Sequence, residues 1–294
     1  MAETELISVS VPPQLVGQPP ELPPYLDEWP PTEDELPCDD GKPMETPRHR
    51  QQMNLLIESL ELHWADRDDF YVGGNMFLYY NVAQQKKNDF AGPDFFVVLD
   101  VPRREHKSWV IWQEGKGPDV VIELLSESTA EYDRTEKKLI YQDRVRVPEY
   151  FYFDPFSLEL AGFQMRGGAY KPIQPDTNGN LLSEQLGLLL TRAEGAFQGV
   201  HTTWLRLATP DGEILPSGEE KARAAQHEAR AAQREAKAAQ HEAEAAQQRA
   251  SELETMLAQY REQFGELPEQ MQRKTARKKT SGGGRRKGSK GRQS

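Results

Sequence analysis

Two carboxylates inside one apolar run are the first residues that could do chemistry. The run Gly117–Ser126, GPDVVIELLS, has the length and the branched side chains of a buried strand. It carries Asp119 and Glu123, and an unpaired carboxylate is costly to bury in an apolar strand. The two residues share one face but lie about 13 Å apart along a strand, so they cannot hold one ion together. Glu123 therefore needs a partner from another strand.

A second run offers that partner. The segment Gly92–Asp100, GPDFFVVLD, repeats the Gly-Pro-Asp opening and places Asp94 at the start of another predicted strand. If the strands are neighbours, Asp94 and Glu123 can converge on one Mg²⁺, with Mn²⁺ as the alternative ion. Mg²⁺ prefers one or two protein carboxylates as ligands, with waters and substrate phosphate completing its coordination. Such an ion polarises a phosphoryl group and supplies a hydroxide.

A cation is also expected near the attacking water. Leu125, two residues after the buried glutamate, cannot supply it. The next segment, SESTAEYDRTEKKLIYQDR, predicts a helix in which Asp133, Lys137 and Tyr141 at i, i+4 and i+8 line one face. We expect Lys137 to reach back over the sheet, the other two residues to orient it or pack beneath it, and Lys138 to point into solvent.

Structural roles remain open for the acidic candidates. Asp94 could simply cap a turn after its proline, and we expect Asp119 to do so at the start of its strand. Glu123 could form only a structural salt bridge, with Lys137 or with Arg134. The discriminating geometry is carboxylate oxygens of Asp94 and Glu123 within roughly 4–5 Å, with Lys137 nearby.

Two further polar residues have simpler explanations. Ser126 fits a cap or turn better than a nucleophile, because no Ser-His-Asp pattern surrounds it. His49, at the start of a predicted helix, could approach a substrate but fits a surface histidine better.

The elements that must position these residues occupy 46–216. Thr46-Pro47 predicts a helix start, and Met53, Leu56 and Leu60 give that helix an apolar face. The strands are predicted at 70–81, 94–101, 109–115, 119–125 and 148–155, in a hairpin around Gly167-Gly168, and at 204–216.

Four motifs in this order resemble the putative restriction endonuclease domain family, a branch of the PD-(D/E)XK nuclease superfamily. The resemblance covers about 46–216, with one departure at Phe151, where the family usually has Trp. The motifs are Pro93-Asp94, Glu123-Leu124-Leu125-Ser126, Asp133-Arg134 with Lys137 and Tyr141, and Pro148-Glu149-Tyr150 through Asp154-Pro155.

The resemblance implies an α/β fold, restriction-endonuclease-like, with a mixed central sheet flanked by helices. It also implies DNA hydrolysis with a lysine on the helix after the glutamate strand. The implied roles are Asp94 and Glu123 as metal ligands, Lys137 as catalytic cation, and Asp133, Tyr141 and Ser126 as supporting residues.

Residues 217–266 predict a coiled coil. The segment holds four successive alanine-rich heptads, and the same seam continues through Leu253 and Leu257 to Tyr260 and Phe264. A seven-residue period held this long is typical of a coiled coil. The helix could pair with a second copy, forming a dimer, or with a helix of another protein, and a lone solvated helix is the third possibility.

The two ends of the chain differ in charge from the middle. Residues 1–45 form a proline-rich acidic arm outside the resemblance, and 267–294 a basic tail that we expect to be disordered. Residues 271–294 hold ten Lys or Arg and no acid, which leaves 26 basic and 47 acidic residues, a balance of −21, in 1–270. The tail is either a solvated appendage or a phosphate-binding segment through Lys274, Arg277, Lys278, Lys279, Arg285, Arg286 and Lys287.

Two function classes stay open. One is a Mg²⁺-dependent endonuclease, favoured by the three catalytic candidates. The other is a catalytically inactive nuclease-fold module that binds or assembles proteins through the coiled coil, favoured by the acidity of 1–270.

The first residues lack signal-peptide features and no apolar run approaches about 20 residues, so we expect a cytoplasmic protein without a membrane segment. A single cysteine, Cys38, excludes an intramolecular disulfide and a Cys-based zinc cluster.

Overall fold

The computed structural model describes residues 29–38, 46–81 and 90–265. The predicted tail and most of the predicted arm lie outside them. The chain divides into two compact units, Met1–Arg223 and Ala224–Ser294. The first contains every described strand, and the second contains most of a single long helix, α4 (Gly218–Phe264).

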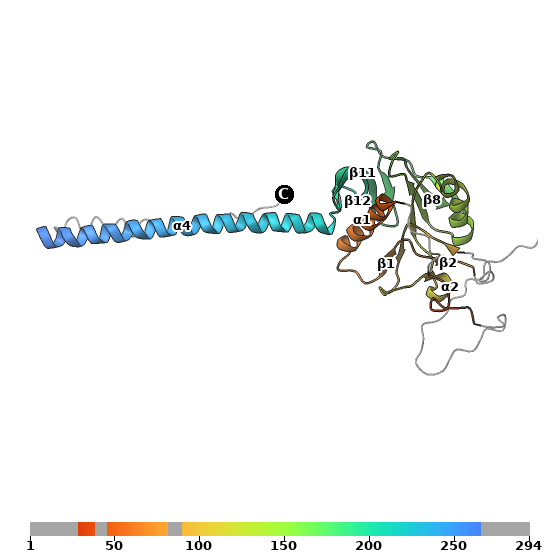
Figure 1. The fold of residues 1–294 in the computed structure, drawn as a ribbon, viewed down its shortest axis with the longest axis horizontal. Helices are drawn as coiled ribbons and strands as arrows, with labels where there is room; N and C mark the ends of the chain where they lie inside the picture. Colours follow the sequence, from red (N-terminus) through yellow and green to blue (C-terminus); the bar gives the residue numbers. More distant parts are fainter. Residues whose placement is uncertain (1–28, 39–45, 82–89, 266–294) are drawn as a thin grey trace, which may run out of the picture. The chain divides into compact units, whose positions relative to one another are not determined.

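A six-stranded mixed sheet forms the centre of the first unit (Figure 1). Neighbouring strands are antiparallel except for β6 and β7, which are parallel. A parallel pair needs a long crossover, and here the crossover contains α3 (Ala130–Tyr132), η2 (Asp133–Lys137) and η3 (Ile140–Val145). The sheet confirms the predicted α/β architecture. In spatial order its strands are β1 (Phe70–Gly73), β4 (Phe95–Leu99), β6 (Val120–Leu124), β7 (Glu149–Phe153), β8 (Leu160–Arg166) and β9 (Ala169–Pro172).

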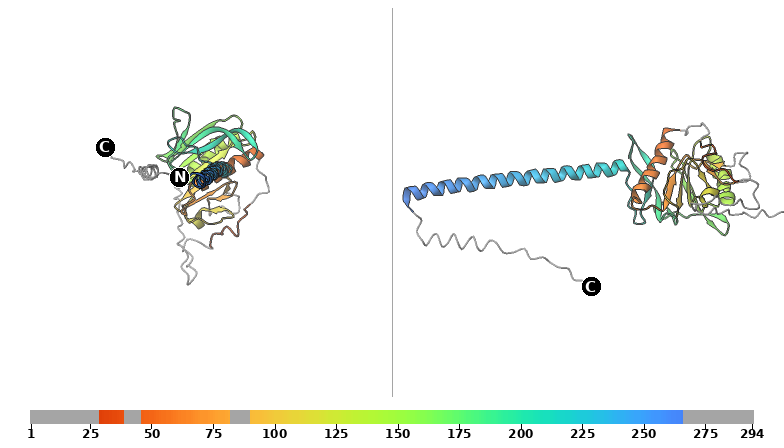
Figure 2. Two further views of the ribbon diagram at one scale, coloured as in Figure 1. Left: turned by 90° about the vertical axis from the view of Figure 1, so that its left-hand side faces the viewer. Right: turned by 90° about the horizontal axis from the view of Figure 1, so that it is seen from below.

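Different elements cover the two faces of this sheet. On the first face lie α1 (Pro47–His63) and a three-stranded sheet, which together bury one apolar cluster. On the second face lie the helical crossover and a small sheet, around a second cluster. The right-hand view of Figure 2 shows α1 (orange) and the crossover (yellow-green) on opposite sides of the central strands. The covering strands are β10 (Leu181–Ser183), β11 (Leu188–Phe197) and β12 (Val200–Ala208) on the first face, and β2 (Leu78–Tyr79), β3 (Phe90–Ala91) and β5 (Trp109–Val110) on the second.

Strand β6 contributes to both clusters because successive side chains of a strand point to opposite faces. Val120, Ile122 and Leu124 lie in the first cluster. Val121 and Leu125 lie in the second. The alternation directs the intervening Glu123 to the second face, beneath the crossover.

Helix α1 and the hairpin confirm their sequence signals. The Thr46 side chain accepts a hydrogen bond from the His49 amide, and Pro47 is the first helical residue. The β8–β9 hairpin turns at Gly167 and Gly168, with φ values of 62° and 82° that favour glycine.

Two predicted strands are wrong in extent. In 109–115 only Trp109 and Val110 form a strand, and α2 (Ile111–Glu114) follows, ended by the left-handed Gly115 at φ 73°. The run 70–81 is split between two sheets, because β1 ends at Gly73 and β2 begins at Leu78.

Part of the predicted arm packs against α2 and the loop before β5, within the first unit. The Glu33 amide donates to Gln113 Oε1 at 2.9 Å, and the Lys107 amide donates to Glu33 Oε2 at 3.0 Å. The Trp112 indole donates to the Pro31 carbonyl at 2.8 Å. Within the described ranges, we find no helix of sufficient length and apolarity to cross a membrane.

Candidate active site

The pairing of β4 with β6 brings the two predicted carboxylates together. Phe95 pairs with Ile122 in this antiparallel register, so the preceding Asp94 lies opposite the following Glu123. Asp94 Oδ2 accepts a hydrogen bond from the Leu124 amide at 2.8 Å, and the Asp94 amide donates to Glu123 Oε2 at 3.4 Å. Residues 29 positions apart in the chain thus become cross-strand neighbours.

Gly74, the first residue after β1, allows this approach. A Cβ on Gly74 would lie 2.2 Å from the Asp94 carbonyl oxygen and 2.8 Å from Met53 Sδ. The Asn75 amide donates to the Pro93 carbonyl at 2.9 Å. The Gly-Gly segment therefore packs directly on the backbone that carries the first carboxylate.

Lys137 reaches the carboxylates from the crossover. Its Nζ lies 2.8 Å from Glu123 Oε2 and 3.4 Å from Asp133 Oδ1, and it donates to the Gly92 carbonyl at 3.0 Å. Only 14% of its side chain is exposed. Leu125 is fully buried in the second apolar cluster. The cation near Glu123 is therefore Lys137 from the crossover, because no residue of the strand supplies one.

Tyr141 engages the other oxygen of the glutamate. Its hydroxyl donates to Glu123 Oε1 at 2.7 Å, and both side chains are fully buried. The crossover is π-helical at 133–137 and 140–145 rather than a regular α-helix. In an α-helix four residues overshoot one turn by about 40°, and wider π turns reduce this drift. The widening keeps Asp133, Lys137 and Tyr141 on one side.

Burial and charge set the protonation of this cluster. Burial raises the pKa of Glu123 well above its ordinary value, although Lys137 acts in the opposite direction. Burial alone would lower the pKa of Lys137, but the attraction of Glu123, Asp94 and Asp133 outweighs it and raises that pKa. Burial also raises the pKa of Tyr141, so its hydroxyl stays protonated as a donor.

The donor set suits a hard divalent cation. Asp94 and Glu123 offer carboxylate oxygens from adjacent strands. Among residues 29–38, 46–81 and 90–265 there is no group of three or more His, Cys, Asp or Glu arranged to hold a metal. Two carboxylates completed by water and substrate phosphate suit Mg²⁺ or Mn²⁺, whereas structural zinc requires four protein ligands.

Three other predicted residues have structural contacts. Ser126 Oγ accepts from the Thr129 amide at 3.2 Å and so caps the turn before α3. Asp119 Oδ2 accepts from the Leu99 amide at 2.7 Å and lies 3.0 Å from Lys116 Nζ, so it joins the start of β6 to the end of β4 rather than capping a turn as predicted. Arg134 pairs with Glu159 at 2.6 Å.

His49 was wrongly predicted to lie on the surface. It is buried, and its Nε2 donates to the Leu125 carbonyl at 2.9 Å, which leaves Nδ1 to accept from the Thr46 hydroxyl at 2.8 Å. The histidine thus ties the first turn of α1 to the end of β6. Phe156, 60% exposed, lies against the same ring with centroids 6.0 Å apart.

Lys138 was also wrongly predicted to point into solvent. Its Nζ lies 3.6 Å from the centroid of the Phe163 ring, a cation–π geometry. Burial lowers the pKa of this lysine. The wide turns of the crossover direct the Lys138 side chain toward the sheet rather than into solvent.

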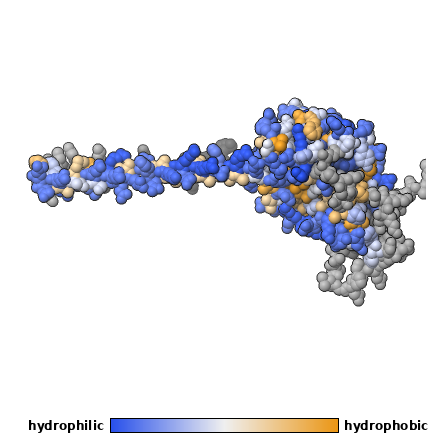
Figure 3. All heavy atoms as spheres, in the orientation of Figure 1, coloured by the Kyte–Doolittle hydropathy of each residue, from blue (hydrophilic) through white to orange (hydrophobic). Residues whose placement is uncertain are grey.

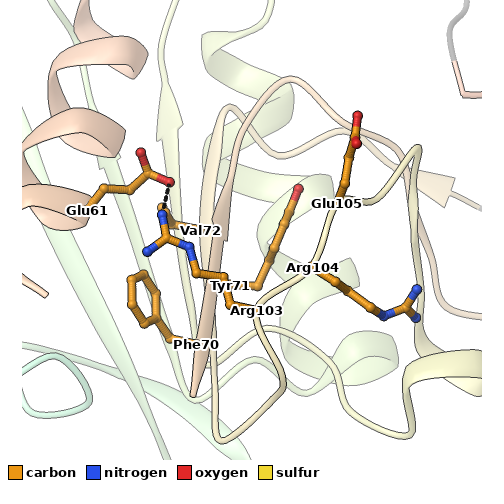
Figure 4. Close-up of a pocket in the computed structure, with 7 residues that line it drawn as sticks. All are labelled: Glu61, Phe70, Tyr71, Val72, Arg103, Arg104 and Glu105. Atoms are coloured by element: carbon orange, nitrogen blue, oxygen red, sulfur yellow. Dashed lines mark hydrogen bonds and ion pairs between the residues drawn. The ribbon is translucent and has the colours of Figure 1, made fainter. Parts of the chain in front are cut away.

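A surface pocket elsewhere in the first unit contains none of the candidate residues (Figure 4). It lies between α1, β1 and the loop after β4. Its cations are already paired, since Arg103 binds Glu61 at 3.0 Å and Arg104 binds Glu33 and Glu114. The pocket therefore does not compete with the carboxylate cluster as the site of chemistry.

A mixed sheet with facing carboxylates and a nearby lysine defines a restriction-endonuclease-like protein. The family model described as "Putative restriction endonuclease" (Uma2) matches residues 24–193. The chain belongs to this family. The match begins inside the proline-rich arm, so the expectation that the whole arm lies outside the resemblance was wrong.

One solved structure similar to this chain is the crystal structure of a putative nuclease from Anabaena variabilis. It shares 16% sequence identity, with a TM-score of 0.38, over 53% of this chain and 91% of that chain. No curated protein matches the sequence.

Proposed function

We propose that this protein is a divalent-metal-dependent endonuclease that hydrolyses phosphodiester bonds in DNA. The observation that carries the proposal is the convergence of Asp94, Glu123 and Lys137, with Lys137 Nζ 2.8 Å from Glu123 Oε2. Membership of the restriction endonuclease family supports the same reaction class.

Each residue of the cluster has a defined role in this proposal. Asp94 and Glu123 would hold Mg²⁺, or Mn²⁺, which when bound polarises the phosphoryl group and lowers the pKa of water. Lys137 positions the attacking water or stabilises the developing negative charge. Asp133, 3.4 Å from the lysine, and Tyr141, 2.7 Å from the glutamate, fix their orientations.

DNA is the proposed substrate although residues 1–270 carry a formal net charge of −21. The proposed phosphate contacts lie in the basic tail, outside the described residues. Seven cations there would release counterions from the duplex and hold it near an otherwise acidic protein. They are Lys274, Arg277, Lys278, Lys279, Arg285, Arg286 and Lys287.

Plasmid cleavage in Mg²⁺ or Mn²⁺ tests the reaction. We expect Glu123→Gln to abolish cleavage and Lys137→Ala to reduce its rate about 10²–10³-fold. Glu159→Gln is the matched control, because Glu159 pairs with Arg134 away from the cluster and should leave cleavage unchanged. Cleavage that survives in both cluster variants would come from a contaminating nuclease and would overturn the assignment.

A second readout separates the enzyme from a catalytically inactive module. Calorimetric titration with Mg²⁺ or Mn²⁺ should detect binding to the wild type and weaker binding to Glu123→Gln. A folded wild type that neither binds metal nor cuts any DNA form would favour the module that acts through its C-terminal helix.

A further inference from the structure

Helix α4 carries an apolar stripe of exposed side chains. The 47-residue helix has no buried residue, and Figure 3 shows apolar patches along its otherwise hydrophilic surface. Large side chains gather over its last three turns with exposed fractions between 41% and 68%. We call them the C-terminal apolar stripe: Leu253, Met256, Leu257, Tyr260 and Phe264.

The stripe continues a strict heptad seam. With a at Ala222 and d at Ala225, every later a and d position as far as Ala250 is alanine. The following a and d positions are Leu253, Leu257, Tyr260 and Phe264. Alanine seams let helices approach closely but bury little area, so most of the apolar burial would come from the stripe. A seven-residue period also sets the left-handed supercoil of a coiled coil.

We propose that the stripe pairs with a second copy of this chain, in a parallel and in-register coiled coil. This proposal concerns assembly and does not depend on the nuclease activity. In a parallel pair, residue g of one helix faces residue e of the next heptad in its partner. Arg249 is a g residue and Glu254 the matching e residue. An in-register pair therefore forms two Arg249–Glu254 ion pairs.

The remaining g and e residues are compatible with the same orientation. The earlier g residues Glu228, Glu235 and Glu242 face neutral glutamines in a parallel pair, at positions 233, 240 and 247. In an antiparallel pair, g faces g, and full overlap of the helices would place Glu242 beside its own copy and Glu235 beside Arg249. The repulsion between the two Glu242 copies is opposed by the attraction of the Glu235–Arg249 pairs, so the sizes of the seam residues decide the orientation.

The sizes of the seam residues agree with this arrangement. Parallel, in-register pairing places each large a or d residue of the stripe opposite the same residue of the second copy, in one continuous apolar contact. Antiparallel pairing would place Leu257 opposite Ala225 and spread the large residues along the alanine seam. The contiguous contact excludes more water around the large side chains.

Disulfide cross-linking tests the orientation. The exposed native cysteine is first removed as Cys38→Ser. Ala246→Cys, at a d position, should then cross-link with its own copy under mild oxidation, because facing d residues bring Cβ atoms within disulfide range. Gln248→Cys, at the outward f position, is the control and should stay reduced. Antiparallel pairing would instead cross-link a mixture of Ala232→Cys and Ala250→Cys chains.

Sedimentation equilibrium tests the stoichiometry. The full chain should have twice its 33.5 kDa mass. Leu253→Glu combined with Leu257→Glu should yield monomers, whereas Ser251→Glu with Thr255→Glu adds the same charge on the outward side and should keep the dimer. A monomeric wild type, a larger oligomer, or cross-linking only in the mixed antiparallel sample would overturn the proposal.

Discussion

At the scale of single residues, Glu123 depends on the crossover for its conformation. Lys137 and Tyr141 contact different oxygens of its carboxylate, at 2.8 and 2.7 Å. The carboxylate is fully buried, so no bulk water can replace either contact. Both contacts come from one helical segment, so the crossover determines the orientation of Glu123, the proposed metal ligand.

Tyr141→Phe tests this dependence. The variant removes the hydroxyl that donates to Glu123 Oε1 and leaves the ring in place. Partners that orient metal ligands are worth about 10–100-fold in metal affinity or activity. We therefore expect cleavage and Mg²⁺ affinity to fall by that factor, as measured by plasmid cleavage and calorimetry.

A second buried tyrosine supplies the control. Tyr170 donates to the Val147 carbonyl at 2.9 Å and does not contact the carboxylates. Tyr170→Phe should cost stability but leave the metal requirement unchanged. Equal loss of metal affinity in both variants would mean that Tyr141 acts only through packing.

Periodicity placed Asp94, Glu123 and Lys137 each on a face of its element, but that the two strands are neighbours was only a condition of the prediction, and the order of the family motifs implied the grouping. The burial of His49 was not predictable. Its partner, the Leu125 carbonyl, lies 76 positions away and belongs to the backbone, so no side-chain pattern in the sequence indicates it.

At the scale of elements, close packing around Asp94 depends on one glycine. Gly74→Ala would place a methyl group 2.2 Å from the Asp94 carbonyl oxygen, and backbone there cannot move without shifting β4. We expect the free energy of unfolding to fall by about 1–3 kcal/mol and metal affinity to weaken. Urea unfolding and calorimetry measure the two effects.

Gly195→Ala is the matched control for that substitution. A Cβ at Gly195 would meet nothing within 4 Å, although the residue also lies in the first unit. Its stability and metal affinity should match the wild type. If Gly74→Ala behaved in the same way, the close approach to Asp94 would not constrain the site.

The first turn of α4 is held to β12 by a bidentate ion pair. Arg206, which is buried, binds Glu220 at 2.6 and 3.1 Å. Hydrogen bonds from Arg206 lower the pKa of Glu220 below its ordinary value of 4.5. A carboxyl group whose pKa is lowered in the folded state stabilises the fold at pH values above its unfolded-state pKa. This contribution is lost as the pH falls through its folded-state pKa.

Glu220→Gln should therefore destabilise the first unit only where the carboxylate is ionised. At pH 7 we expect a loss of about 1 kcal/mol, because charge-assisted hydrogen bonds are strong but Glu220 is partly exposed. The difference from wild type should shrink toward zero below about pH 4. Urea unfolding at both pH values measures it, and a constant difference would contradict the assigned role.

Elements were predictable where local chemistry decides them. Thr46-Pro47 begins α1 and Gly167-Gly168 turns the β8–β9 hairpin, as each dipeptide indicates. The strand predicted at 109–115 failed because its aromatic content resembles a strand, whereas Gly115 caps a helical turn whose Trp112 packs against Tyr79. The π turns of the crossover, at 133–137 and 140–145, were not predictable, because the spacing of its side chains fits an α-helix as well.

At the scale of the whole molecule, the uneven charge sets how DNA binding should respond to salt. Replacing the seven proposed phosphate-binding cations of the tail with glutamine should weaken binding at all sequences alike. It should also flatten the dependence of log K on log salt, since each phosphate contact contributes about −0.9 to the slope on duplex DNA. Fluorescence anisotropy at several salt concentrations measures the slope, and an unchanged slope would mean that the tail does not contact phosphates.

The proposed parallel pairing of α4 would have a consequence for the proposed cleavage of DNA. Each first unit precedes its own helix in the chain, so a parallel coil tethers two active sites to the same end. Two tethered sites can cut both strands of a duplex in one encounter, because the second cut becomes effectively intramolecular. The wild type should convert supercoiled plasmid to linear DNA with little nicked intermediate.

Leu253→Glu with Leu257→Glu separates assembly from chemistry, because both positions lie in the second unit and outside the carboxylate cluster. The variant should keep the rate of the first cut per site but accumulate nicked circles, since each monomer must rebind to cut the second strand. Ser251→Glu with Thr255→Glu should behave like the wild type. If the dissociated variant made linear DNA as directly as the dimer, double-strand cleavage would not need two tethered sites, and the coil would serve another purpose in the protein.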